Sequence, residues 1–193
     1  MYIGSDNQPF DLIFDTGSNW LWVNGRFCEN CNNKPRFDER TSKNHRFFDV
    51  LVDLHYGSGD VYGYNSIDTV CIRPGDCAND FSFLTVGMQT GLSSLYSSGI
   101  VGLSPNSDDS VNDLFIIKMK ESGVIEKAVF SLMIELDNNK SKMTFGGIDL
   151  AKMAALGSKL NYHNIDPENM KWWTLKLESM TLSGTKKALE TQE

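Results

Sequence analysis

Asp15 stands in the stretch FDTGSNWLWV, residues 14–23, between two runs of apolar residues. An ionised carboxylate at such a place is costly to bury unless hydrogen bonds are supplied locally. Thr16, Gly17 and Ser18 follow at once and can supply them. The stretch therefore predicts a tight turn that presents one carboxylate between two strands. What this carboxylate does depends on the elements that surround it.

The four cysteines form two close pairs, Cys28 with Cys31 and Cys71 with Cys77. An even count in local pairs is typical of short-loop disulfides that form in an oxidising compartment. Two alternatives stay open. The wide spacing of the second pair disfavours a four-thiolate zinc site, and the lack of a clear helix at Cys28 disfavours a redox Cys-x-x-Cys.

Other polar motifs carry weaker signals. His45, His55 and His163 are scattered and are predicted to be surface residues rather than a set of metal ligands. Asn139, Lys140 and Ser141 form an N-glycosylation sequon, a triplet that also arises often by chance. We expect no metal and no cofactor.

Composition excludes several functional classes. The 193 residues are 40% apolar and 22% charged, as in soluble globular proteins. A net charge of −7 without a basic block argues against nucleic acid or an anionic membrane as a partner. No apolar run approaches the roughly 18 residues of a membrane span. The first ten residues lack the basic start and apolar run of a signal peptide.

The elements that must position Asp15 are predicted to be mostly strands. Segments with β-favouring residues or period-two alternation are 10–14, 20–23, 47–56, 61–72, 81–87, 99–103, 129–136, 141–150, 158–162 and 172–182. Gly57 and Gly59 predict a hairpin tip at 56–60. One helix is predicted at 111–121, with N-caps at 108–110 and a stop at Gly123. The predicted fold class is mainly β.

In this order the segments resemble the pepsin-like aspartic proteases. The segment IFDTGSNWLWV resembles the first active-site loop of that family, YGSGDVYG its flap, and GIVGL the strand beneath the loop. The segments FSLMIEL and MTFGGID resemble the end of the N-terminal lobe, and KWWTLKLESMTLSG the opening strands of the C-terminal lobe. The resemblance runs from about residue 2 to about 184.

The resemblance implies a particular architecture. We expect a pepsin-like lobe of twisted, partly open, barrel-like β-sheets with a flap hairpin and one or two short helices. Residues 1–150 would form the N-terminal catalytic lobe with the active-site loop and the flap. Residues 151–193 would form inter-lobe strands and the truncated start of a C-terminal lobe.

The resemblance also assigns roles around the carboxylate. Asp15 would be a catalytic aspartate, with Thr16 and Gly17 completing its loop and Ser18 hydrogen-bonding the carboxylate from outside. The remaining matches are the flap tyrosine Tyr56, the supporting Trp22, the flap backbone at Gly57 and Ser58, and the pocket walls Ile13 and Ile100. The flap backbone would bind an extended substrate strand.

The cysteine pairs differ in how well the family accounts for them. Cys28 and Cys31 match the small disulfide loop that follows the active-site strand, although this loop is tighter than usual. Cys71 and Cys77 have no counterpart in the simplest members. We expect this second pair to staple a hairpin.

In this family two aspartates share one proton, because like charges so close together cannot both ionise. The ionised aspartate takes a proton from a water that attacks the peptide carbonyl, and its partner protonates the oxyanion. The present sequence holds a single Asp-Thr-Gly; Asp68 and Asp109 are followed by Thr-Val and Ser-Val. We therefore expect an incomplete chain with one of the two catalytic aspartates.

The predicted function is an aspartic endopeptidase that hydrolyses polypeptides at acid pH, with a C-terminal lobe or a second chain supplying the other aspartate. One alternative is a non-catalytic peptide-binding or inhibitory lobe. A further alternative is a homodimeric single-lobe protease in which Asp15 of two chains forms the pair. The family and the paired cysteines imply a secreted or a lysosomal or vacuolar location.

Overall fold

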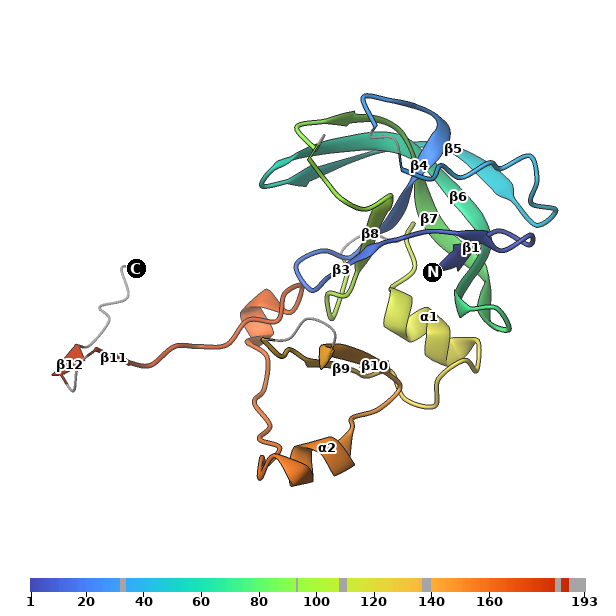
Figure 1. The fold of residues 1–193 in the computed structure, drawn as a ribbon. Helices are drawn as coiled ribbons and strands as arrows, with labels where there is room; N and C mark the ends of the chain where they lie inside the picture. Colours follow the sequence, from blue (N-terminus) through green and yellow to red (C-terminus); the bar gives the residue numbers. More distant parts are fainter. Residues whose placement is uncertain (32–33, 93, 108–110, 137–139, 183–184, 188–193) are drawn as a thin grey trace.

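The structure, a computed structural model, describes residues 1–193 except 32–33, 93, 108–110, 137–139, 183–184 and 188–193 (Figure 1). Strands dominate the described residues. In chain order the elements are β1 (Tyr2–Ile3), β2 (Gln8–Pro9), β3 (Ile13–Asp15), β4 (Leu21–Glu29), β5 (Arg46–Tyr56), β6 (Gly59–Arg73), β7 (Asp76–Thr90), β8 (Gly99–Gly102), α1 (Phe115–Glu121), β9 (Phe130–Met133), β10 (Lys142–Phe145), α2 (Leu150–Ala155), a 3-10 helix (Pro167–Asn169), β11 (Met180–Leu182) and β12 (Thr185–Lys187). The mainly β class is confirmed.

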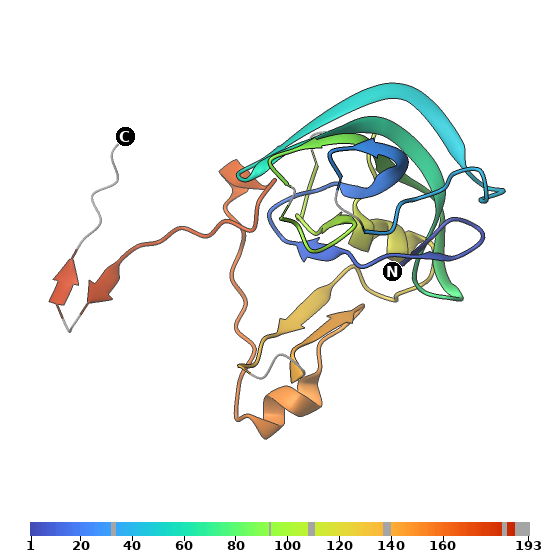
Figure 2. The same cartoon turned by 45° about the horizontal axis from the view of Figure 1, so that its top comes forward.

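One large sheet forms the body of the molecule. Its strand order is β2-β1-β6-β7-β4-β8-β3, and β5 pairs with β6. The long strands β5, β6 and β7 curve over one side of the molecule, so that the sheet curls into a partly open barrel (Figure 2). Two pairs are parallel, β3 with β8 and β4 with β7. Parallel neighbours cannot be joined by a tight hairpin, so these pairs bring together segments that are distant in the sequence.

Two apolar clusters fill the two faces of this sheet. Phe81 and Phe83 of β7 belong to one cluster, together with Phe115 of α1. Leu84 and Val86 belong to the other cluster, which also contains Trp22. The alternation of side chains along a strand sends them to opposite faces, as period two requires. The second cluster lies directly beneath the hairpin of β5 and β6, because Tyr56 packs against it.

Both predicted disulfides are confirmed. Cys71 and Cys77 are bonded partners that face each other across the β6–β7 hairpin. Cys28 and Cys31 are bonded at the end of β4. All four cysteines of the chain are therefore bonded in these two pairs.

The predicted helix at 111–121 begins later than expected, at Phe115. Its N-cap residue Leu114 makes no side-chain capping bond, and the expected caps at 108–110 lie outside the described residues. The Val111 carbonyl instead accepts hydrogen bonds from the Asn65 amide and the Ser82 hydroxyl, both in the large sheet. The predicted stop is confirmed, since Gly123 adopts a φ of +72°.

The strands predicted at 158–162 and within 172–179 are wrong. Neither segment is paired in the structure, and β11 begins only at Met180. Leu175 and Leu177 are each 59% exposed, so these apolar residues have no sheet face to cover. An alternating pattern forms a strand only where a neighbouring strand can pair with it. Figure 1 shows β11 and β12 at the end of an extended segment away from the large sheet.

The three histidines and the glycosylation sequon are the remaining motifs of the sequence. His45 is half-buried against the Phe37 ring and hydrogen-bonded to Ser66, contrary to the surface position expected, and burial lowers its pKa. His55 and His163 are exposed, as predicted. Asn139 of the sequon lies outside the described residues. Among the helices in the described ranges, none is long and apolar enough to cross a membrane.

Candidate active site

Asp15 is the last residue of β3, at the point where the chain leaves the sheet. It lies beside Gly102 in the parallel pairing of β3 with β8. The Leu103 amide donates to the Asp15 carbonyl at 2.8 Å, and the Ser104 amide donates to the Ser18 carbonyl at 2.9 Å. On the other side of the loop, the Gly102 amide donates to the Trp20 carbonyl at 2.8 Å. The end of β8 therefore holds both ends of the loop.

Gly102 makes this close approach possible. A Cβ atom at this position would lie 2.5 Å from the Asn19 carbonyl carbon and 2.6 Å from the Trp20 nitrogen. Both atoms belong to backbone that is already hydrogen-bonded, so they cannot move aside cheaply. The glycine in GIVGL is therefore a packing requirement of the Asp15 loop.

The Asp15 carboxylate is oriented by its own turn. The Gly17 amide donates to Asp15 Oδ1 at 2.9 Å, which is the local bond that the sequence predicted. Asp15 is half-buried, whereas Thr16 and Gly17 are exposed. One face of the carboxylate is therefore fixed by the backbone while the group remains open to a ligand.

The bond expected from Ser18 to Asp15 is absent. Ser18 Oγ is buried and has no hydrogen-bond partner among the residues that the structure describes. It lies near the Tyr56 hydroxyl, where it opposes the rise in pKa that burial causes in that group. Ser18 therefore belongs to the loop, but its side chain does not bind the Asp15 carboxylate in this structure.

Residues 56–60 form the tip of the β5–β6 hairpin, as predicted. Tyr56 pairs with Gly59, and Gly57 and Ser58 form the exposed turn. Trp22 Nε1 donates to the Tyr56 hydroxyl at 2.8 Å. Burial raises the pKa of Tyr56 to about 12, against the opposing effect of the Trp22 hydrogen bond, and the Asp15 carboxylate adds to the rise. Tyr56 thus lies within electrostatic reach of Asp15.

The two predicted wall residues are neighbours in different environments. Ile13 and Ile100 pair across β3 and β8. Ile100 is only 7% exposed and packs in the cluster beneath the flap, whereas Ile13 is 41% exposed. Of the two, Ile13 offers more surface to a ligand.

A polar network behind the loop was not predicted. Asn19 donates to the Ser107 hydroxyl at 2.6 Å, Ser107 donates to Asn112 at 2.9 Å, and Asn112 donates back to the Asn19 carbonyl at 2.9 Å. Asn19 and Asn112 are 93 residues apart in the chain. No local sequence pattern could signal such a pairing. The network ties the loop to the segment that precedes α1.

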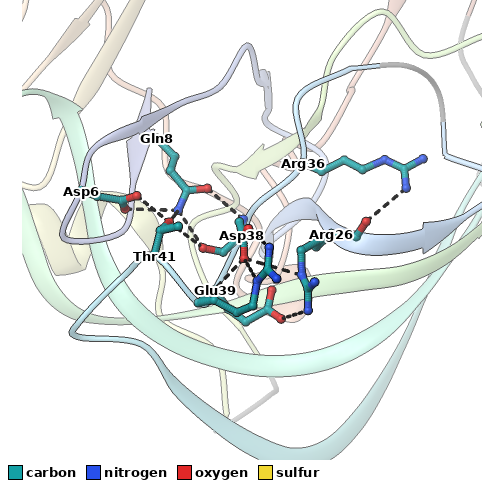
Figure 3. Close-up of polar contacts among 8 residues, drawn as sticks. Asp6, Gln8, Arg26, Arg36, Asp38, Glu39 and Thr41 are labelled. Carbon is teal, nitrogen blue, oxygen red and sulfur yellow. Dashed lines mark hydrogen bonds and ion pairs between the residues drawn. The ribbon is translucent and has the colours of Figure 1, made fainter.

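A second network anchors the segment that leads into the flap strand β5 (Figure 3). Gln8 Nε2 donates to the Asp38 carbonyl and to Thr41 Oγ1, both at 2.9 Å, while the Asp38 amide donates to Gln8 Oε1 at 2.8 Å. Arg26 of β4 lies 3.6 Å from the Asp38 carboxylate. The hydrogen bond from Arg40 lowers the pKa of Asp38 to about 2.

The other carboxylates with an Asp-Thr or Asp-Ser pattern differ from Asp15. Asp68 is buried in the middle of β6, where its Oδ1 accepts bonds from Ser42 Oγ at 2.9 Å and from the Thr69 amide at 2.7 Å. It supports the sheet and is not presented by a loop. Asp109 lies outside the described residues.

A cavity of about 600 Å³ lies beside the Asp15 loop. Thr16 and Leu103 line it together with Phe115, Phe130 and Trp173, whereas Tyr56 and Trp22 do not. Trp173 Nε1 donates to the Leu103 carbonyl at 2.9 Å, so the C-terminal segment reaches the backbone that supports Asp15. Neither Asp15 nor Tyr56 lines this cavity.

Comparison with known proteins adds independent evidence. The model of the family described as eukaryotic aspartyl protease matches residues 1–193. Camel (Camelus dromedarius) chymosin is 29% identical over 192 residues, which are 95% of this chain and 48% of the relative. Bovine (Bos taurus) chymosin is 28% identical over 98% of this chain and 50% of the relative. Plasmepsin IV of Plasmodium falciparum is 34% identical over 76% of this chain and 34% of the relative. The chain spans half or less of the length of these relatives.

Proposed function

Because the chain belongs to the eukaryotic aspartyl protease family, we propose that it is the flap-bearing half of an acid endopeptidase in which Asp15 is one of two catalytic carboxylates. One observation carries this proposal. A loop braced by β8 presents Asp15 beneath a hairpin whose Tyr56 is hydrogen-bonded to Trp22. A purely structural turn would require neither the flap nor the aromatic pair beside it.

The chemistry follows from two carboxylates that share a proton. The ionised carboxylate accepts a proton from a water held between the two, and the resulting hydroxide oxygen attacks the peptide carbonyl carbon. The protonated carboxylate donates its proton to the developing oxyanion, and the C–N bond then breaks with proton transfer to the leaving amine. Asp15 supplies one of these groups. A C-terminal lobe or a second chain supplies the other.

Substrate recognition is proposed to use the flap and the end of β3. An extended polypeptide would lie between the hairpin tip and Asp15, with hydrogen bonds to the backbone of Gly57 and Ser58. Ile13 and, at greater depth, Ile100 would contact an apolar side chain beside the scissile bond. Thr16 and Gly17 shape the loop around the carboxylate.

The division of the chain is part of the same proposal. Residues 1–150 carry the loop, the flap and the large sheet, and act as the catalytic lobe. Residues 151–193 connect this lobe to the part that supplies the second aspartate. The two disulfides are consistent with a secreted, lysosomal or vacuolar location.

The function is tested by peptide hydrolysis with the 193-residue chain at acid pH over a series of protein concentrations. We expect no turnover from the monomer, because one carboxylate cannot act as base and acid at once. Turnover by the monomer would contradict the proposal. A rate that rises as the square of the concentration and is lost in Asp15→Asn would favour the homodimer. Tight peptide binding without turnover, even with a second lobe present, would favour the non-catalytic lobe.

A further inference from the structure

The outer face of the flap carries a group of polar side chains that the mechanism above does not use. Tyr56, Leu54 and Val52 alternate toward the cluster that contains Trp22. His55 and Asp53 therefore point to the opposite face of β5, as period two requires. Across the hairpin, His55 pairs with Asp60, and Asp53 pairs with Tyr62.

These side chains form a bridge across three strands. His55 Nδ1 and Asp60 Oδ1 are 2.7 Å apart, and His55 Nε2 lies 3.5 Å from Asp53 Oδ2. Thr90, at the end of β7, donates its hydroxyl to Asp60 Oδ2 at 3.2 Å. The bridge runs from β5 through β6 to β7, directly behind the tip that carries Tyr56.

The backbone near this bridge is closely packed. Asp60 pairs with Thr90, and Gly91 follows with a φ of +74°. A Cβ atom at Gly91 would lie 2.6 Å from the Ser58 carbonyl oxygen, so the end of β7 lies against the flap turn. A side-chain hydrogen bond between β6 and the end of β7 therefore helps to hold the flap turn in place.

We propose that the bridge of Asp53, His55, Asp60 and Thr90 is a clamp in which His55 is a positioning residue that holds the flap, and with it Tyr56, over Asp15 when the imidazole is protonated. The protonated imidazole donates from both nitrogens, to Asp60 and toward Asp53. The neutral imidazole can donate from only one. The functional consequence rests on the proposed protease function, whereas the clamp itself does not.

The charges around the clamp determine its working pH range. The hydrogen bond to Asp60, with Asp53 adding to it, raises the pKa of His55, and His55 in turn lowers the pKa of Asp60. Tyr62 faces the same carboxylates, and burial and both aspartates raise its pKa, so it stays neutral. Thr90 is uncharged.

These pKa shifts determine the pH range in which each group stabilises the clamp. The contribution of His55 is fully present below its unfolded pKa of about 6.5 and is lost as the pH rises through the raised folded value. The contribution of Asp60 is present above about pH 4 and is lost as the pH falls through the lowered folded value. The clamp is therefore engaged at mildly acidic pH, where an acid protease works.

Hydrogen exchange of the flap amides in the purified chain tests the clamp. We compare wild type with His55→Gln at two pH values. About pH 5 lies below the ordinary pKa of histidine, and about pH 8.5 lies well above it. His163→Gln is the matched control, because His163 is also exposed but lies far along the chain. Variants are compared only at equal pH, which removes the intrinsic pH dependence of exchange.

We expect His55→Gln to speed exchange of residues 57–60 by about two- to fivefold at the acid pH, the range for exposed ion pairs, and to leave it unchanged at the alkaline pH. Asp60→Asn should have the same effect, and the double variant no more than either single one. Equal exchange in wild type and His55→Gln at acid pH, or a difference that persists at alkaline pH, would overturn the clamp. The measurement needs no substrate, so a failed clamp and a failed protease function give separate results.

Discussion

At the scale of single residues, the hydrogen bond from Trp22 to Tyr56 joins the sheet to the flap. Trp22 is fully buried, and its indole N–H donates to the Tyr56 hydroxyl at 2.8 Å. We expect Trp22→Phe to lower the free energy of unfolding by about 1–3 kcal/mol through loss of this donor. Trp20→Phe is the control for lost packing, because the Trp20 side chain is also buried, at 3% exposure. Denaturant unfolding of Trp22→Phe, Tyr56→Phe and the double variant should give non-additive losses. Additive losses would show that the two side chains do not act together.

The ionisation of Tyr56 gives a second prediction at this scale. Burial raises its pKa to about 12. An ultraviolet titration should therefore show a tyrosine that ionises near this value and disappears in Tyr56→Phe. Because the folded pKa is raised, the contribution of Tyr56 to stability is present below its unfolded pKa of about 10 and is lost as the pH rises toward 12. An unchanged titration curve in Tyr56→Phe would contradict the burial of this hydroxyl.

At the scale of elements, the close contact between β8 and the Asp15 loop predicts an unequal response of two glycines. Gly102→Ala would place a methyl group against the backbone of Asn19 and Trp20. We expect a loss of about 1–3 kcal/mol in the free energy of unfolding, as for other overpacked sites. Gly147→Ala is the control, because a Cβ atom there meets nothing within 4 Å. Equal effects of the two substitutions in thermal or denaturant unfolding would contradict the described packing.

The segment before β5 gives a pH prediction. The Arg40 hydrogen bond lowers the pKa of Asp38 to about 2. A lowered folded pKa means that the stabilisation is present above the unfolded value of about 3.9 and is lost as the pH falls toward 2. We expect Asp38→Asn to be less stable than wild type at neutral pH and the difference to shrink with acidification across this range. Denaturant unfolding as a function of pH measures it, and a constant difference would show that the charge of Asp38 is not the cause.

The elements around the site could be predicted where the signal was local. The Asp15 turn, the hairpin at 56–60 and the two disulfides each depend on residues that are close in the sequence. The start of α1 could not be predicted, because the Val111 carbonyl is bound by Asn65 and Ser82 of the sheet. The Asn19–Ser107–Asn112 network depends on a fold that places residues about 90 positions apart side by side. The Ser18 hydroxyl was assigned to Asp15 by resemblance alone, and the structure places it near Tyr56.

At the scale of the whole molecule, several large apolar side chains are exposed in the C-terminal third of the described residues. Ile134 and Tyr162 are each 84% exposed, and Leu175 and Leu177 are each 59% exposed. Such surfaces mark sites of protein contact when they are contiguous. The failed strand predictions at 158–162 and 172–179 belong to this region, where neither segment pairs with a strand among the residues that the structure describes. Under the function proposed above, these side chains would contact the further lobe.

The central claim is that Asp15 is one of two carboxylates that must act together. The most direct measurement is acid peptide hydrolysis by this chain joined to a C-terminal lobe of a related aspartyl protease that carries a second Asp-Thr/Ser-Gly loop. We predict that the joined protein hydrolyses peptides and is inhibited by a mimic with a tetrahedral hydroxyl. Asp15→Asn in the same protein should reduce the rate by a factor of about 10⁴ or more, while the protein stays folded. Undiminished hydrolysis by the Asp15→Asn protein would contradict the account.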